Sequence, residues 1–400
     1  MSETQKHTKP NVPNLRFPGF SGEWERIRVS DLLEFFSTNS LSWEQLEYGG
    51  TEILNLHYGL IHNGLPTQIN IEESILPSVR TEFKPRKYML CKDGDVAFAD
   101  ASEDTNDVGK VVEFMKCADR EIVCGLHTIH GRDKLGKTIP GFKGYAFSSS
   151  AFHKQLRRIA QGTKIFSINT GNFEETFIGI PNKGEQKKIA SLLSIIDQRI
   201  AIQNRIIEDL KRLKTAICKS IALSIDAEWH PLTSLISNGS IVLKRGLVIP
   251  KKEKSEINRY PVYSSSVVND GLMGYNDTYM FEDELVSWSI DGGGNFFYRH
   301  PHKFNITNVS GVILADKAIW NYRFIAEMLS FQHSKQTFDY QSKAHPSIIC
   351  DLYSLPMISL DEQTRYARLF EAIDDRLSVQ TSFRKDAQKM KTHLMRQMFI

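Results

Sequence analysis

One segment of this chain occurs twice. Residues 184–214 (GEQKKIASLLSIIDQRIAIQNRIIEDLKRLK) return at residues 361–391 (DEQTRYARLFEAIDDRLSVQTSFRKDAQKMK), and Glu185 and Glu362 set the offset at 177 residues. Further identities at this offset pair Gln186, Ala190, Ile196, Asp197, Arg199, Gln203, Asp209 and Lys214 with Gln363, Ala367, Ile373, Asp374, Arg376, Gln380, Asp386 and Lys391. The repeat constrains the fold strongly, because both copies must adopt one structure in two places.

Each copy predicts one long helix. Neither has an internal proline, and each places a glutamate in its first turn, where the helix dipole favours negative charge. Residues spaced alternately by four and three positions form a heptad seam. The seam comprises Ile189, Leu193, Ile196, Ile200 and Gln203 in the first copy, and Tyr366, Phe370, Ile373, Leu377 and Gln380 in the second. Beyond Gln380 the apolar positions predict a slip of one residue, to Phe383, Ala387, Met390 and Leu394.

A lone helix in water cannot bury such a seam, so each helix needs a partner. We expect the two copies to pack antiparallel as a coiled-coil spacer, which turns the tandem repeat into pseudo-twofold symmetry. About 40 residues at 1.5 Å per residue make a helix about 60 Å long. The alternative is that each helix packs only on its own globular segment.

A globular segment precedes each helix, and each opens on a Glu-Trp pair, at 23–24 and at 228–229. Strand-like runs, short helices and Gly/Asn turns alternate in both segments, which predicts an α+β fold. The predicted boundaries are a disordered tail at 1–14, a first globular domain at 15–180, a first helix at 181–225, a second globular domain at 226–355 and a second helix at 356–400.

The composition is that of a globular protein, with 41% hydrophobic and 24% charged residues. The sequence has no apolar run long enough to span a membrane and no signal-peptide core at its N-terminus, so we expect a cytoplasmic protein. The net charge of +3 is uneven: residues 184–221 hold eight Lys/Arg against four Asp/Glu, and residues 361–400 hold eight against six. A basic excess on helices is usually a solvated face, and a nucleic-acid or acidic partner is the sharper alternative.

The five scattered cysteines argue against a disulfide framework. Cys117, Cys124, His127 and His130 lie close in sequence and raise the question of zinc. The local pattern predicts a strand, in which residues 124 and 127 face opposite sides. The sequence therefore predicts no metal site.

From Gly131 to Thr138 the sequence GRDKLGKT matches the pattern of a phosphate-binding loop. That motif needs a helix directly after it, whereas IPGFKG follows here and cannot begin one. Dinucleotide fingerprints, nucleophile elbows, H-E-x-x-H and the Asn/Asp-Pro-Pro-aromatic tetrapeptide of amino-methyltransferases are absent from the sequence. The sequence predicts no catalysis, and the alternatives are a nucleotide-binding enzyme using this loop and a coiled-coil adaptor that binds no DNA.

Several phrases resemble the specificity subunits of type I restriction–modification systems. They are NLRFPGFSGEWERIRVSDLLEF at 14–35, LCKDGDVAFADASEDTNDVG at 90–109, RYPVYSSSVVNDGLMGY at 259–275 and the two helices that begin with Glu-Gln. The resemblance covers nearly the whole chain. It implies two target recognition domains, each recognising one half of a split DNA sequence, with paired helices holding them apart and no catalysis by this chain.

The resemblance also implies partners. Two modification subunits would dock on the helices and methylate adenine with S-adenosylmethionine. Restriction subunits would use ATP and Mg²⁺ to translocate and cut DNA. This chain would bind none of these cofactors itself, and its own ligand would be double-stranded DNA.

Loops that are polar and aromatic at once are the candidates for DNA contact, because their side chains suit base edges and phosphates. They equally suit ordinary surface loops. The candidates are Ser102, Lys137, Gln161, Thr163 and Lys164 in the first domain, and Lys244, Arg245, Ser264, Ser265, Tyr275, Lys343 and His345 in the second.

Overall fold

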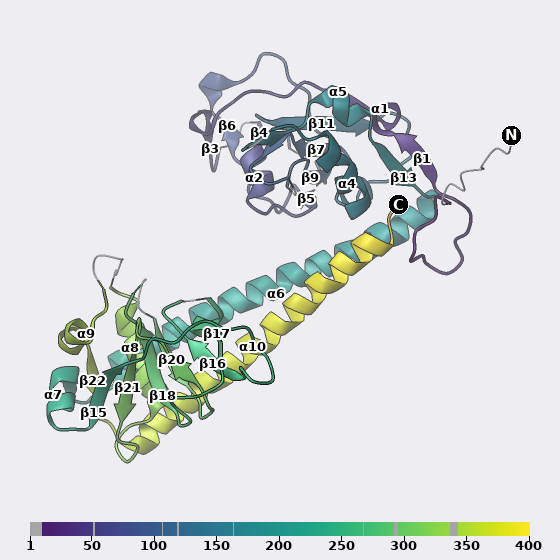
Figure 1. Cartoon of the computed structure of the whole chain (residues 1–400). Helices are drawn as coiled ribbons and strands as arrows, with labels where there is room; N and C mark the ends of the chain where they lie inside the picture. The colour runs from purple at the N-terminus through teal and green to yellow at the C-terminus, as the bar shows by residue number, and fades with distance from the viewer. Residues whose placement is uncertain are drawn as a thin grey trace. The chain divides into compact units, whose positions relative to one another are not determined.

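The computed structural model describes residues 10–50, 53–105, 107–117, 120–162, 164–266, 268–291, 295–336 and 343–400. It divides into two units: unit 1 is Met1–Asn204 with Phe383–Ile400, and unit 2 is Arg205–Ser382. Two long helices, α6 (Lys183–Ser224) and α10 (Leu360–Gln397), each contribute residues to both units (Figure 1). The predicted α+β class with two long helices is confirmed.

Unit 1 mixes short strands and short helices. Its elements before α6 are β1 Glu25–Arg28, α1 Val29–Leu32, β2 Leu33–Phe36, η1 Trp43–Gln45, β3 Leu46–Glu47, β4 Leu54–Leu56, α2 Tyr58–His62, β5 Gln68–Asn70, β6 Ser78–Val79, η2 Thr81–Phe83, β7 Val96–Ala99, β8 Ala101–Ser102, β9 Val111–Met115, β10 Ile122–Cys124, β11 Thr128–Asp133, α3 Lys143–Phe147, α4 Ser150–Ile159, β12 Phe166–Ser167, α5 Thr170–Glu174 and β13 Phe177–Ile180. The strands form sheets of order β2-β11-β7-β9-β5 and β10-β4-β6-β3, with the ribbons β1-β13 and β12-β8. One buried core packs on α6 and a second lies between the two larger sheets.

Unit 2 is built in the same manner. Its elements outside α6 and α10 are β14 Trp229–Pro231, α7 Leu232–Ser237, β15 Ile241–Arg245, β16 Tyr260–Tyr263, η3 Val268–Gly271, β17 Leu272–Asn276, β18 Leu285–Ser289, β19 Phe296–Arg299, β20 Asn305–Ile306, β21 Ser310–Ala315, α8 Tyr322–His333, α9 Pro346–Leu352 and β22 Ser354–Pro356. The sheets have the orders β15-β21-β18-β19 and β17-β16-β20, with the ribbon β14-β22. The core around Trp288 and Phe324 packs against Phe370 of α10.

In each unit the first strand of the globular segment pairs with the last. β1 runs antiparallel to β13, and β14 runs antiparallel to β22. The last strand then leads within a few residues into a long helix. The first and last strands of each globular segment therefore lie side by side. The residues between them form an insert whose two ends meet at this strand pair.

The repeated Gln186 and Gln363 perform the same task in the two units. Both side chains are fully buried at the start of a long helix. The Gln186 oxygen accepts from the Ile139 N–H at 2.9 Å, and its amide donates to the carbonyls of Lys137 and Pro181. The Gln363 oxygen accepts from the Asn321 N–H at 2.9 Å, and its amide donates to the carbonyls of Ile319 and Ile358. Each glutamine thus fixes a globular segment to its helix by satisfying otherwise buried backbone groups.

The repeated acid and lysine also act alike. In unit 1 Lys391 of α10 lies 2.6 Å from Asp197 of α6. In unit 2 Lys214 of α6 lies 3.0 Å from Asp374 of α10. Unit 1 adds a bond from Arg384 to Asn204, so residue numbers rise along one helix as they fall along the other. Within each unit the helices are antiparallel, as predicted (Figure 1).

The predicted seam is the buried side of the helices. Ile189, Leu193, Ile196, Gln203, Phe370 and Ile373 are buried, and Ile200, Tyr366, Leu377 and Gln380 are half-buried. Of the residues predicted beyond Gln380, Ala387 is buried and Leu394 packs against the unit 1 core. Phe383 and Met390 are 47% and 57% exposed, so the predicted slip is wrong at these two positions. Arg384 and Lys391 keep the heptad positions instead, since Asn204 and Asp197 accept hydrogen bonds from them. Within the described residues, none of the helices is both long and apolar enough to cross a bilayer.

Candidate nucleic-acid interface

Unit 1 brings three of the predicted residues to one loop. β8, which ends at Ser102, pairs antiparallel with β12. Gln161 forms a β-bridge with Ser167 of β12, and the exposed Lys164 lies two residues before Phe166, the partner of Ser102. Thr163 lies outside the described residues. We call Ser102, Gln161 and Lys164 the unit 1 loop.

A cluster of aromatic and imidazole rings lies next to this loop, and none of its residues is among the predicted contacts. The rings of Trp43 and His57 are 4.4 Å apart, and Tyr58 contacts His57, His62 and His127 at 4.7–5.9 Å. His62 Nε2 lies 2.8 Å from the carbonyl of Ala101, directly before Ser102. Flat rings beside polar side chains suit stacking and base-edge contact. The signal available in the sequence was the pattern HYGLIH at 57–62 with Trp43.

His127 holds a strained backbone within this ring cluster. Its φ is 55°, a left-handed conformation that residues other than glycine seldom adopt. The strand predicted through residues 124 and 127 is therefore wrong: β10 ends at Cys124, and the chain turns before β11. The His127 ring lies 3.2 Å from Asp100. Burial raises the pKa of Asp100, and burial together with His127 lowers the pKa of His57. Strain of this kind is typical of functional loops.

Unit 2 gathers predicted residues at one end of its sheets. The Thr307 hydroxyl donates to Ser264, and the Ser289 hydroxyl donates to the Ser265 carbonyl. Just beyond Ser289, Lys343 pairs with Asp291 at 2.9 Å, and His345 occupies the N-cap position of α9. The exposed Lys244 and Arg245 end β15, whose partner β21 begins at the same sheet end. We call Lys244, Arg245, Ser264, Ser265, Lys343 and His345 the unit 2 end.

A buried arginine holds the loop that follows Ser264 and Ser265. Asn269 and Asp270 both have positive φ, at 51° and 52°. Arg299, only 5% exposed, donates to the Asp270 carbonyl at 2.7 Å and to the Ser287 hydroxyl at 2.9 Å. Burial lowers the pKa of Arg299 to about 10. Both units therefore carry a strained loop beside their candidate residues.

Tyr275 lies on the β17-β16-β20 sheet, close to cations that are not among the predicted contacts. Lys254 lies over the Tyr275 ring at 5.4 Å, Lys303 over Tyr279 at 4.6 Å, and Arg259 over Tyr260 at 5.2 Å. Tyr260 and Tyr275 lie on strands of this sheet, and the other four residues lie in segments next to it. We call these six residues the basic-aromatic sheet of unit 2. The segment KKEK at 251–254 was the available signal, but its pairing with rings depends on the register of β16 and β17.

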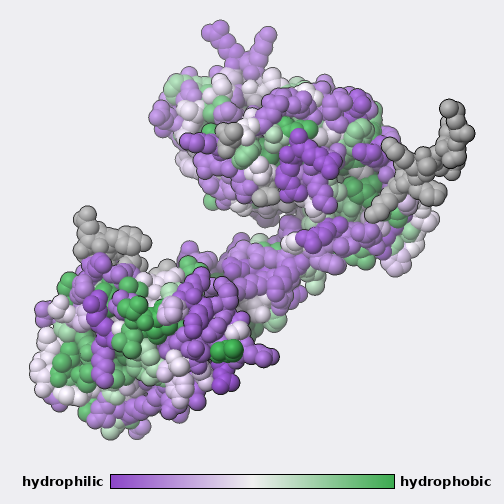
Figure 2. All heavy atoms as spheres, in the orientation of Figure 1, coloured by the Kyte–Doolittle hydropathy of each residue, from purple (hydrophilic) through white to green (hydrophobic). Residues whose placement is uncertain are grey.

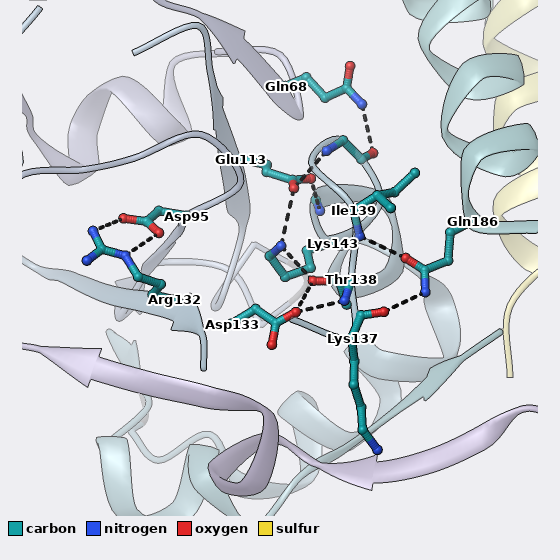
Figure 3. Close-up of polar contacts among 12 residues, drawn as sticks. Gln68, Asp95, Glu113, Arg132, Asp133, Lys137, Thr138, Ile139, Lys143 and Gln186 are labelled. Atoms are coloured by element: carbon teal, nitrogen blue, oxygen red, sulfur yellow. Dashed lines mark hydrogen bonds and ion pairs between the residues drawn. The ribbon is translucent and has the colours of Figure 1, made fainter. Parts of the chain in front are cut away.

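Lys137 has a different role from the other candidates. Its ammonium pairs with Glu25. Its carbonyl accepts a hydrogen bond from the Gln186 amide (Figure 3). The carboxylate of Asp133 accepts bonds from the Thr138 hydroxyl and backbone, and Lys143 donates to the same hydroxyl at 2.8 Å. The loop from Gly131 to Thr138 therefore supports the start of α6. It does not have the arrangement of a phosphate-binding loop, because the Asp133 carboxylate accepts the hydrogen bonds that Thr138 would donate to a phosphate.

Glu113 completes this junction beneath the loop. Its carboxylate accepts from the backbone N–H groups of Gly141 and Gly144, both at 2.8 Å, and lies 3.6 Å from Lys143 (Figure 3). Burial raises the pKa of Glu113 to about 7. Every charged group of the junction is matched to a partner in the chain, which identifies a structural site.

Comparisons with known proteins agree with this architecture. Residues 22–212 match the model of the type I restriction modification DNA specificity domain. A putative type I specificity subunit of Mycoplasma genitalium is 27% identical over 216 residues, covering 50% of this chain and 54% of that protein. In sequence, the chain is therefore similar to type I specificity subunits over about its first half. The N-terminus of a putative type I specificity subunit of Mycoplasma pneumoniae is 36% identical over 96 residues, covering 23% of this chain and 51% of that protein.

These coverages show that the chain spans about half the length of the two specificity subunits it is compared with. The fold similarity extends further. The crystal structure of the S subunit of a type I restriction–modification system from M. genitalium superposes with a TM-score of 0.64 at 18% identity, covering 97% of this chain and 99% of that one. A chain from a structure of type I R-M complex assembly and conformational transition gives a TM-score of 0.54 at 13% identity, covering 96% and 98%.

Proposed function

We propose that this chain is a type I specificity subunit and recognises a bipartite DNA sequence, with each unit contacting one half. The observation that carries the proposal is that each unit presents polar residues, rings and cations beside a strained loop, on a segment closed by its own strand pair. The unit 1 loop with its ring cluster, and the unit 2 end with the basic-aromatic sheet, combine groups for phosphates and for base edges.

The chemistry would then reside in partner subunits. Adenine methylation with S-adenosylmethionine, and translocation with ATP and Mg²⁺, would be performed by modification and restriction subunits, and this chain would supply sequence choice. We place the complex in the cytoplasm, where DNA is accessible. The cysteines of the described residues are free thiols, which suits a reducing compartment.

DNA contact is testable through its salt dependence. Alanine at the four cations of the unit 1 loop and the unit 2 end should weaken binding to random duplexes of one length, because phosphate contacts are sequence-independent. The slope of log affinity against log salt should fall by about one per lost contact. The four cations are Lys164, Lys244, Arg245 and Lys343. Fluorescence anisotropy of the full chain across a salt series measures both quantities.

A control variant with the same change in charge tests whether helix α6 contacts DNA instead of the proposed surfaces. Alanine at four exposed cations of α6 should leave affinity and slope near the wild-type values. These cations are Lys187, Arg205, Arg212 and Lys219. If the control variant loses affinity and the loop variant does not, the helices contact DNA and the proposed surfaces are wrong. If the wild-type chain binds no duplex at low salt, an adaptor role is favoured.

Partner docking is proposed from a second apolar stripe on each helix. On α6, Ile195, Ile202 and Leu213 are 59%, 55% and 48% exposed, and their spacing keeps them on one face away from the buried seam. On α10, the matching Val379 and Met390 are 49% and 57% exposed. Apolar residues repeated in this way on exposed faces are typical of a binding surface. Most of the helix surface shown in Figure 2 is hydrophilic, so the stripe is a local exception.

The stripe predicts two equivalent docking sites, because each long helix holds one copy of it. Ile202→Glu should remove one modification subunit from the assembled complex, and Ile202→Glu with Val379→Glu should remove both. Native mass spectrometry of the co-expressed complex would count them. The matched control is Ala201→Glu with Ser378→Glu, which puts the same charge on the neighbouring exposed residues but about 100° around each helix. Full assembly of the double stripe variant would contradict the proposal.

A further inference from the structure

A cluster of metal-binding side chains lies in the core of unit 1 between its two larger sheets. Cys91, Cys124 and His130 are buried, and one ligand atom from each lies within 4.8 Å of the other two. The two sulfur atoms are 3.6 Å apart. The residues come from three segments: the chain before β7, the end of β10 and the middle of β11.

His130 has the hydrogen bonding of a metal ligand. Its Nε2 lies 2.8 Å from Asp95 Oδ2, and the Asp95 carboxylate is itself held by Arg132 at 2.7–2.8 Å and by the Lys92 N–H at 2.9 Å. Its Nδ1 is buried and has no hydrogen-bond partner among the described residues. A metal-ligating histidine almost always bonds a carboxylate or carbonyl through its other nitrogen, which fixes the ring and its tautomer. A buried ring nitrogen left without a partner is otherwise costly.

We propose that Cys91 Sγ, Cys124 Sγ and His130 Nδ1 bind one Zn²⁺ ion. Tetrahedral zinc with bond lengths of about 2.3 Å to sulfur and 2.0–2.1 Å to nitrogen places its ligand atoms about 3.5–3.8 Å apart, which matches the separation of the two sulfurs. Thiolate and imidazole ligands select zinc over magnesium or calcium. Cys117, a third buried thiol of the same core, is the candidate for the fourth position.

This set differs from the one that sequence spacing suggested, because the chain turns between Cys124 and β11. The positive φ of His127 directs that residue into the ring cluster, while Cys91 approaches from a distant segment. The Cys91 N–H donates to the Ile122 carbonyl at 2.9 Å, which places it beside β10. Zinc would therefore tie down both ends of the Cys124–Thr128 turn that carries His127. The metal would have a structural role, and the proposal does not depend on DNA recognition.

The test uses the full-length chain, purified under reducing conditions. After gel filtration, elemental analysis should give one equivalent of zinc. Chelation should lower the Tm, and Zn²⁺, but not Mg²⁺, should restore it. Exchange with Co²⁺ should give the thiolate charge-transfer and visible absorption bands of a tetrahedral site. Because these measurements use the wild-type protein, they remain decisive if a ligand variant fails to fold.

Variants then assign the ligands. Cys124→Ser and His130→Ala should each lose the metal, and Cys117→Ser should weaken the tetrahedral cobalt bands. Cys350→Ser, in unit 2, is the matched control and should keep both metal and bands. Two results would overturn the proposal: wild-type protein that carries no metal and gives no cobalt spectrum, or a Cys91–Cys124 disulfide detected by mass spectrometry in freshly prepared protein.

Discussion

Aspartate at Ile196 is expected to unfold the helix pair of unit 1. Ile196 is 7% exposed in the seam between α6 and α10. Removing a buried isoleucine side chain costs about 2–5 kcal/mol, and burying an unpaired carboxylate adds about 2 kcal/mol or more. The stability of a whole domain is about 5–15 kcal/mol, so this substitution removes most of it. Thermal unfolding followed by circular dichroism, together with limited proteolysis, would measure the loss.

The adjacent Ile195 provides the matched control. It is 59% exposed, so Ile195→Asp makes the same chemical change without burying a charge. We expect this variant to unfold within a few degrees of wild type, although it alters the proposed docking stripe. Equal unfolding temperatures for the two variants would mean that the seam is not the stabilising face.

The repeat allows the same experiment in unit 2. Ile373 is the counterpart of Ile196 and is also 7% exposed, while Ala372 is exposed and matches Ile195. Ile373→Asp should therefore destabilise unit 2 as Ile196→Asp destabilises unit 1, with Ala372→Asp as its control. A large effect in one unit and none in the other would show that the two copies pack differently despite their shared sequence.

The long helices could be predicted because the heptad spacing of their seam is written in the sequence twice. The slip after Gln380 could not be excluded in advance, because Phe383 and Met390 are apolar and Arg384 and Lys391 are charged. At these two positions the structure differs from the prediction, because Arg384 and Lys391 donate hydrogen bonds to Asn204 and Asp197 of α6. The spacing of apolar residues in one helix does not predict hydrogen bonds to a second helix, and such bonds allow charged residues at heptad positions.

The candidate interface was predictable only in part. Gln161 and Lys164 were selected from a loop composition, and the structure places them beside Ser102 through the β8-β12 ribbon. The ring cluster around Tyr58 joins α2 to the turn before β11, a contact between residues far apart in sequence. The buried Arg299 was equally hidden, because its function depends on a loop that it meets only after folding. The DNA contacts stay predictions.

Exchanging one globular segment should change one half of the methylated DNA sequence. β1 pairs with β13 from Arg28 with Phe177 to Glu25 with Ile180, so residues 29–176 begin and end at one strand pair. A relative's segment inserted between these strands should keep the docking by Gln186, whose bond to the Lys137 carbonyl requires only backbone. The other half-site and the gap should persist, because unit 2 and the helices are unchanged.

The reciprocal exchange in unit 2 is the control for that result. β14 and β22 pair from Trp229 with Pro356 to Pro231 with Ser354, which leaves residues 232–353 as the replaceable insert. Replacing it should change the opposite half-site and leave the first intact. Sequencing of methylated adenines in cells that carry each chain with the proposed modification subunits would reveal both halves. If either exchange alters both halves together, the two units do not act as separate recognition elements, and one continuous DNA-binding surface must replace the two proposed here.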